Sequence, residues 1–181
     1  MIRNLATCTD WPHVESDRGE WEEWVKSAPP ANTIHVCLLG EPQGKGRPRS
    51  RIAKTRDGRE YIAIYTPRAT VKYEEALALA GKTAMKRRPP LTGPVKVHVL
   101  AVMSVPPSWS QKKKNDALHG TVRPTVSPDW DNIGKVLDAF NGIVWDDDKQ
   151  IVFGSVEKAY GQLPRLEVQV TPITTDGLFS T

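Results

Sequence analysis

The segment "SPDWDNIGKVLDAFNGIVWDDDKQIV", residues 127–152, holds six aspartates in a chain whose formal net charge is +4. Between the two groups of aspartates lie four apolar residues at the i, i+3, i+4, i+7 spacing of a buried helix face: Ile133, Val136, Leu137 and Phe140. Asp131 and Asn132 suit the N-cap of this helix, and Asn141 followed by Gly142 suits its C-terminal end. The segment therefore predicts a helix with carboxylates at both ends, followed by a strand.

The spacing also separates charge from the apolar face. At 100° per residue, Asp131, Lys135 and Asp138 fall on the opposite side of the helix. Carboxylates one residue apart, joined in space by a third, make a site of hard oxygen ligands, which Mg²⁺ prefers. No His or Cys ligands accompany them, which argues against zinc. Whether the carboxylates at the two ends meet depends on how residues 142–145 fold back, and the sequence does not decide this.

A purely structural role is the alternative for these aspartates. Asp129 and Asp131 can simply cap a helix, and residues 146–149, "DDDK", can form a solvated turn. The apolar residues on both sides of the aspartates argue against a freely solvated loop. A metal site also explains why so many like charges are gathered, because a bound cation offsets their repulsion.

Positive charge gathers in another part of the chain. Residues 44–72 carry nine basic and two acidic side chains. Within "GKGRPRSR", residues 44–51, the cations alternate with Gly, Pro and Ser, a composition that suits contact with phosphates. We therefore predict that this loop binds nucleic acid through Lys45, Arg47, Arg49 and Arg51. The alternative is a solvated loop without a ligand.

Hydrophobic periodicity predicts the remaining elements. Buried strands are expected at 33–40 and 95–105, a helix at 67–88, and a short helix from Ser108. Residues 41–58 are expected to be irregular, with 59–66 returning to close a hairpin. Residues 150–161 and 164–173 alternate like an antiparallel pair. The expected fold is α+β, with a mixed, largely antiparallel sheet and two main helices on one face.

The 181 residues fit one domain. We expect an N-terminal extension at 1–32, a folded domain at 33–171 and a loose tail at 172–181. The apolar runs are too short for a transmembrane helix, so no membrane partner is expected. The N-terminus lacks the features of a signal peptide, and we expect a cytoplasmic protein.

The aspartate segment resembles the RusA family of Holliday junction resolvases. The likeness lies in the pattern D-x-D-N-x-x-K, a short helix carrying a further Asp, and then W-x-D-D-x-Q-[IV], all present within residues 129–151. The upstream "GKGRPR", residues 44–49, resembles the basic loop of phage-type members. The resemblance covers about residues 33–171.

The resemblance implies a homodimeric, Mg²⁺-dependent endonuclease, with Mn²⁺ as an alternative ion and no small-molecule cofactor. It assigns catalysis to Asp129, Asp131, Lys135 and Asp148, and metal binding to the three aspartates among them. Asp147, next to Asp148, can share or exchange the ligand role. A two-fold dimer suits a four-way junction, because it places identical sites on opposite strands.

The implied activity is paired symmetric cleavage of four-way DNA junctions in recombination and repair, in a phage or prophage setting and hence in the host cytoplasm. Two alternatives remain at this stage. One is a nuclease for other branched or flap DNA, which the aspartates do not distinguish from a resolvase. The other is an architectural protein that binds junctions without cutting them, against which the complete Asp and Lys set argues.

Overall fold

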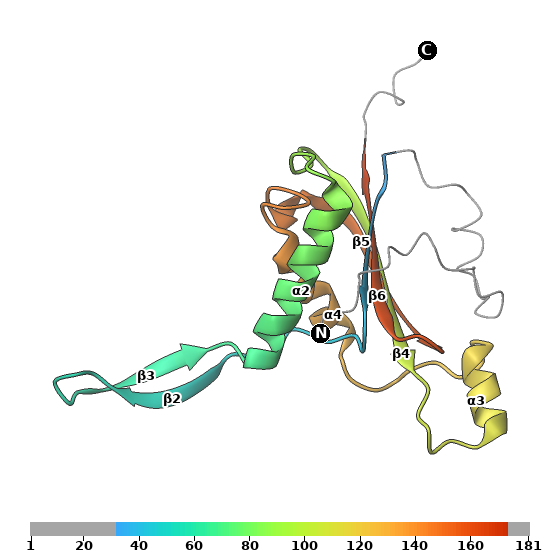
Figure 1. Ribbon diagram of the computed structural model, residues 1–181, viewed down its shortest axis with the longest axis horizontal. Coiled ribbons are helices and arrows are strands. Elements are labelled where there is room, and N and C mark those ends of the chain that lie inside the picture. Colours follow the sequence, from blue (N-terminus) through green and yellow to red (C-terminus); the bar gives the residue numbers. More distant parts are fainter. Residues whose placement is uncertain (1–31, 174–181) are drawn as a thin grey trace, which may run out of the picture.

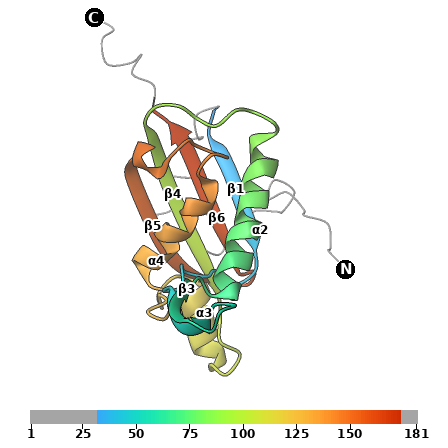
Figure 2. The same ribbon diagram turned by 90° about the vertical axis from the view of Figure 1, so that its left-hand side faces the viewer.

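The fold is built on a four-stranded sheet in the order β1-β6-β4-β5, seen in a computed structural model that describes residues 32–173. Its strands are β1 (Ile34–Leu39), β6 (Arg165–Pro172), β4 (Val95–Ser104) and β5 (Ile151–Gly161). β6 runs antiparallel to both β1 and β4, whereas β4 and β5 are parallel. Helices α2 and α4 cover one face of this sheet (Figures 1 and 2). The predicted α+β class, the mixed sheet and the helix-covered face are confirmed; the predictions for residues 1–31 and 174–181 lie outside the described residues.

The expected pairing of residues 150–161 with 164–173 was wrong. These segments form β5 and β6, but β4 lies between them and pairs with both. β4 is the strand with the longest buried run, from Val99 to Met103, and burial on both faces favours a central position. Residues 162–164 therefore cross over the end of β4. Alternation shows which face of a strand is buried, but it does not identify the neighbouring strand.

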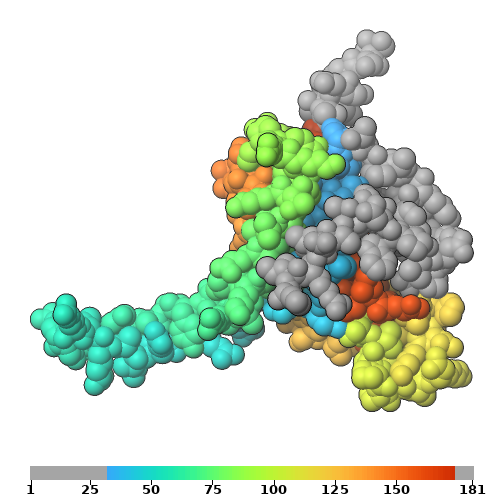
Figure 3. Space-filling model, in the orientation of Figure 1, coloured from blue at the N-terminus to red at the C-terminus, as the bar shows by residue number. Residues whose placement is uncertain are grey.

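A second sheet consists of β2 (Arg49–Lys54) and β3 (Glu60–Tyr65) alone. This hairpin projects far from the body of the protein (Figures 1 and 3). Residues 49–54 were expected to be irregular, and 59–66 was expected to pair with the strand at 33–40; both expectations were wrong. A turn between Thr55 and Arg59, with Gly58 at φ +87°, closes the hairpin locally. The sequence did not reveal β2 as a strand. Both of its faces are exposed, so its Arg residues do not alternate with buried apolar ones.

The core lies between the sheet and its helices. These are α2 (Arg68–Met85), α4 (Trp130–Lys135) and the 3₁₀ helix η2 (Val136–Phe140) that continues α4. All four apolar residues of the predicted face, Ile133, Val136, Leu137 and Phe140, are buried, which confirms that prediction. Phe140 meets the buried Trp145 edge to face, with ring centroids 5.5 Å apart. The predicted N-cap was wrong, because the helix begins at Trp130 with Asp129 as its N-cap residue.

Two short helices complete the fold. α3 (Gln111–Leu118) follows Ser110, whose hydroxyl accepts a hydrogen bond from the Lys113 amide, and it confirms the helix expected in this region. η3 (Asp148–Gln150) is a single 3₁₀ turn that leads directly into β5. Between residues 32 and 173, no helix is both long and apolar enough to cross a membrane.

Candidate active site

The first two predicted catalytic aspartates stand at the start of α4. Both carboxylates are exposed, and Asp129 does not use its side chain to cap the helix. The edge strand β5 fixes the backbone that carries them: Trp130 Nε1 donates to the Val156 carbonyl at 3.0 Å, and Lys158 Nζ donates to the Pro128 carbonyl at 3.0 Å. The aspartates therefore sit on an anchored segment with their oxygens open to a ligand.

Lys135 lies one helical turn beyond Asp131, as predicted. Its Nζ is 2.7 Å from Asp131 Oδ2. This hydrogen bond is the main reason that the pKa of Asp131 lies below its ordinary value. Asp131 is therefore an anion at neutral pH, with the Lys135 cation beside it. Both side chains are more than half exposed, so the pair is open to an incoming phosphate.

The basic loop, which is residues 44–48 before β2, packs directly against the aspartate segment, residues 127–152. The Lys45 amide donates to the Asn132 carbonyl at 2.8 Å. A Cβ at Gly44 would lie 2.9 Å from the Cβ atoms of both Pro128 and Asn132, closer than side chains tolerate. Gly44 is thus required by a close approach of the two segments. The sequence separates them by more than 80 residues, and the fold makes them neighbours.

Lys45 uses its side chain within the protein. Its Nζ lies 2.5 Å from Asp138 Oδ2 and 3.4 Å from Glu74 Oε1. The hydrogen bond to Asp138 is the main reason that the pKa of Lys45 is raised. Asp138 does lie on the polar side of its helix, as predicted. Its ion pair with Lys45 links η2 to the basic loop, and Lys45 in turn lies beside Glu74 of α2. A contact between Lys45 and DNA stays a prediction.

The three arginines predicted to bind nucleic acid are exposed. Arg47 lies in the loop before the hairpin, and Arg49 and Arg51 lie on β2. The register places Arg49 opposite Tyr65, and the Arg51 guanidinium lies 5.8 Å from the centre of the Tyr65 ring. Cations and aromatic rings thus share one face of the ribbon, an arrangement suited to phosphates and bases. Their contact with nucleic acid stays a prediction.

The second group of aspartates surrounds η3. Asp147 caps this turn, because its carboxylate accepts a hydrogen bond from the Lys149 amide at 3.0 Å, and that bond is the main cause of its lowered pKa. Asp148 is exposed. Gln150 ties the turn to the body: Nε2 donates to the Leu91 and Gly93 carbonyls, and Oε1 accepts from the amides of residues 146 and 147. Sequence reasoning assigned Gln150 no role, since its partners lie almost 60 residues away.

The fold does not gather the two groups of aspartates within one chain. Across residues 32–173, no three Asp, Glu, His or Cys side chains are close enough to hold one metal ion. Trp130 anchors the first group beside Val156, whereas η3 ends where β5 begins at Ile151. Five strand residues span about 17 Å. The assignment of Asp147 and Asp148 as ligands with Asp129 and Asp131 stays a prediction.

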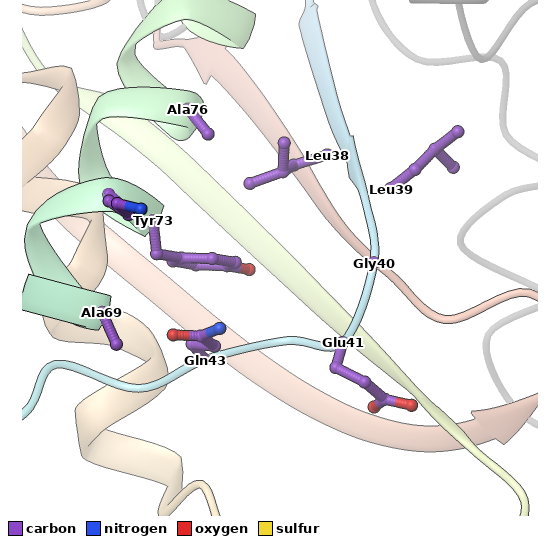
Figure 4. Close-up of a pocket in the computed structure, with 9 residues that line it drawn as sticks. Leu38, Leu39, Gly40, Glu41, Gln43, Ala69, Tyr73 and Ala76 are labelled. Carbon is purple, nitrogen blue, oxygen red and sulfur yellow. The ribbon is translucent and has the colours of Figure 1, made fainter. Parts of the chain in front are cut away.

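A separate hollow of about 400 Å³ lies between the end of β1 and α2 (Figure 4). None of the predicted site residues lines it. Tyr73 stands in its wall, and burial raises the pKa of Tyr73 to about 12. The hydroxyl lies near the Gln43 backbone without a hydrogen bond of normal geometry.

Comparison with known proteins identifies a family that contains the basic loop and the aspartate segment. The family described as "Endodeoxyribonuclease RusA" matches residues 40–171, which include the basic loop, the hairpin and both groups of aspartates. The chain belongs to the RusA endodeoxyribonuclease family. It is also similar to the uncharacterized protein YqaN of Bacillus subtilis (strain 168), at 36% identity over 146 residues, which are 78% of this chain and 97% of YqaN. The predicted resemblance is confirmed, and this RusA-family chain is expected to act on DNA.

Proposed function

We propose that the protein is a Mg²⁺-dependent endodeoxyribonuclease that resolves four-way DNA junctions by paired symmetric cleavage. The observation that carries the proposal is the docking of the basic loop on the aspartate segment, through Gly44 and the Lys45 amide. A phosphate backbone held by Arg47, Arg49 and Arg51 would continue past Asp129 and Asp131. Family membership supports the same chemistry.

The exposed carboxylates fit a hard divalent cation. Asp129 leaves its oxygens uncommitted to the helix cap, and Asp131 is kept ionised by Lys135. Mg²⁺ prefers such oxygen ligands, and when bound it neutralises phosphate charge and acidifies water. Lys135 would approach the same phosphate and stabilise charge on its oxygens during cleavage. Mn²⁺, which also accepts oxygen ligands, is proposed as a substitute.

A second copy of the chain would complete this site. β5 is an edge strand, and Val152 and Phe153 near its start are 63% and 48% exposed. Unpaired edges with exposed apolar residues favour pairing with another strand. If β5 pairs antiparallel with its copy between Val152 and Phe153, two-fold symmetry sets Lys149 of one chain opposite Val156 of the other. Asp148 of the second copy would then lie beside Trp130, near Asp129 and Asp131.

Such a dimer would carry two identical composite sites. Each site would combine Asp129, Asp131 and Lys135 of one chain with Asp147 and Asp148 of the other. Paired symmetric nicks need two such sites related by a two-fold axis. The separation of the aspartates within one chain is therefore the feature that supports a dimeric enzyme.

Cleavage of a synthetic four-way junction tests the proposal. Linear duplex and flap DNA serve as controls, each with Mg²⁺, with Mn²⁺ and with EDTA. We expect symmetric paired nicks in the junction that require the metal and disappear in Asp131→Asn. If the protein cuts the flap in preference to the junction, the proposed nuclease chemistry stands but the proposed substrate is wrong. If it binds the junction tightly and cuts none of the substrates, the proposed nuclease activity is wrong.

A further inference from the structure

Three isoleucines on the projecting hairpin are almost fully open to solvent. Ile52, Ile62 and Ile64 are 71%, 72% and 75% exposed, although isoleucine is among the residue types most often buried. Ile52 and Ile62 are opposite one another in the register, and Ile64 is the next residue on the same face of β3. They form one continuous apolar ridge, which we call the isoleucine ridge.

The two faces of the hairpin differ in chemistry. Successive side chains of a strand point to opposite faces, and residues opposite in the register share a face. Arg49, Arg51, Tyr61 and Tyr65 therefore lie on one face, and the isoleucine ridge lies on the other. Figure 3 shows the hairpin standing clear of the body, so no described part of the chain covers the ridge. A two-stranded ribbon is only marginally stable alone, and contact with a ligand would stabilise it.

The charge around the ridge fits a polyanion. Residues 47–60 carry six cationic and two acidic side chains. Both acids are already paired with cations of the hairpin: Asp57 lies 3.4 Å from Arg59, and Glu60 lies 3.1 Å from Lys54. Arg49 and Arg51, on the opposite face of the ribbon, and Arg56, in the turn, form no ion pair with these acids and remain available for phosphates.

The small size of the ridge also favours DNA over a protein partner. A stable protein–protein interface buries about 800 Å² on each side, more than three isoleucines offer. A two-stranded ribbon fits a DNA groove, and isoleucine is one of the side chains that wedge between base steps. A wedge must offset the cost of unstacking the base step that it opens, and the branch point is where the continuous duplex of each arm ends.

We propose that the isoleucine ridge inserts between the bases at the branch point of a DNA junction, while the cations of the hairpin hold the flanking phosphates. The inference rests on the proposed function and deepens it, because it assigns junction recognition to the hairpin. Cleavage chemistry stays with the aspartates. Preference for junctions over duplex should therefore depend on the ridge, and overall DNA affinity on the arginines.

The test uses the full chain carrying Asp131→Asn, so that binding is read without cleavage. A four-way junction carries 2-aminopurine at the branch point, or six base pairs into one arm as a control. We expect fluorescence to rise on binding only for the branch-point probe. In the triple variant Ile52→Thr, Ile62→Thr, Ile64→Thr, the rise should vanish and junction affinity should fall about tenfold, with duplex affinity changed less than about twofold. Threonine is β-branched and keeps the strand propensity of isoleucine, so the hairpin is retained.

Leu79→Ser on α2 is the matched control, because Leu79 is a 55% exposed apolar residue outside the hairpin. It should change neither signal. Unchanged fluorescence and junction preference in the triple variant would overturn the wedge, and so would a change confined to the oligomeric state, which would make the ridge a protein contact. Cleavage of the same junction by the wild-type chain reports on the proposed function separately, so failure of one is distinct from failure of the other.

Discussion

Lys45 Nζ lies 2.5 Å from Asp138 Oδ2, and this ion pair links the basic loop to η2, the helix that follows the proposed catalytic residues Asp129 and Asp131. The two residues are 93 positions apart. If the pair holds the loop in place, Lys45→Met and Asp138→Asn should each lower junction cleavage several-fold. The double variant should cleave the junction no more slowly than either single variant, because each single substitution already removes the Lys45–Asp138 ion pair. Each should lower the free energy of unfolding by no more than about 1 kcal/mol, since both side chains are partly exposed.

Glu60→Gln is a control for stability, because it breaks an exposed pair at the end of the hairpin. It should leave the free energy of unfolding unchanged. DNA binding at several salt concentrations separates the two roles of Lys45. If Lys45 instead contacts a phosphate, Lys45→Met will weaken binding and reduce the salt slope by about 0.9. Asp138→Asn would then strengthen binding, because it releases the lysine.

Gly44→Ala should damage the site by pushing the basic loop away from the aspartate segment. The new Cβ would lie 2.9 Å from the Cβ atoms of Pro128 and Asn132, so the backbone must shift. Overpacking of this kind destabilises by about 1–3 kcal/mol, and we expect cleavage to fall as well. Gly134→Ala is the matched control: its Cβ would meet Val156 Cγ2 at 3.8 Å, an ordinary contact. Urea unfolding gives the free energy of unfolding of each variant, and cleavage assays give its rate. If Gly44→Ala changes these two quantities no more than Gly134→Ala does, the close approach is not needed.

Features encoded locally in the sequence were predicted well. The buried face of Ile133, Val136, Leu137 and Phe140 follows from helical spacing, because three to four residues complete a turn whatever the rest of the fold does. The α2 helix and the strand β4 followed in the same way. Partners distant in the chain were not predictable. Nothing local places β4 between β5 and β6, or Lys45 beside Asp138.

The hairpin and Gln150 show two further limits. Residues 49–54 carry Arg and Lys on a strand exposed on both faces, so burial leaves no alternation to detect. Gln150 was part of the quoted motif, but its role depends on carbonyls of Leu91 and Gly93 that only the folded chain brings near. The aspartates were identified as a group by composition. Their division between the start of β5, where η3 ends, and its middle, where Trp130 bonds the Val156 carbonyl, became visible only in the folded chain.

Tyr73 should make the protein sensitive to alkali. Burial raises its pKa from about 10 to about 12. Below pH 10 both states are protonated and the full stability is present. As the pH rises from 10 to 12 the unfolded state loses the proton first, so the free energy of unfolding falls by up to about 3 kcal/mol. Urea unfolding at pH 9, 10, 11 and 12 should show a smaller fall for Tyr73→Phe, whereas Tyr65→Phe at an exposed position should follow the wild type. Parallel curves for wild type and Tyr73→Phe would contradict the raised pKa.

A composite site makes a sharp prediction for mixtures of inactive chains. Asp131→Asn and Asp148→Asn should each reduce cleavage by at least about 100-fold, because each would remove a proposed metal ligand from both sites of the proposed dimer. When the two variants are mixed and allowed to exchange subunits, mixed dimers form. In such a dimer one site combines both substitutions, and the other combines the intact Asp131 of one chain with the intact Asp148 of the other. Cleavage should therefore return as single nicks.

The alternative arrangement gives the opposite result. If all the ligands of a site came from one chain, every site in a mixed dimer would carry one substitution, and mixing would restore nothing. Mixing Asp131→Asn with Asp129→Asn is the internal control, because both residues belong to the same end of α4 and every mixed site stays defective. Recovery in the first mixture and none in the second would place Asp148 across the two-fold axis from Asp131. That arrangement would also explain why no three Asp, Glu, His or Cys side chains within residues 32–173 of one chain are close enough to hold a metal ion.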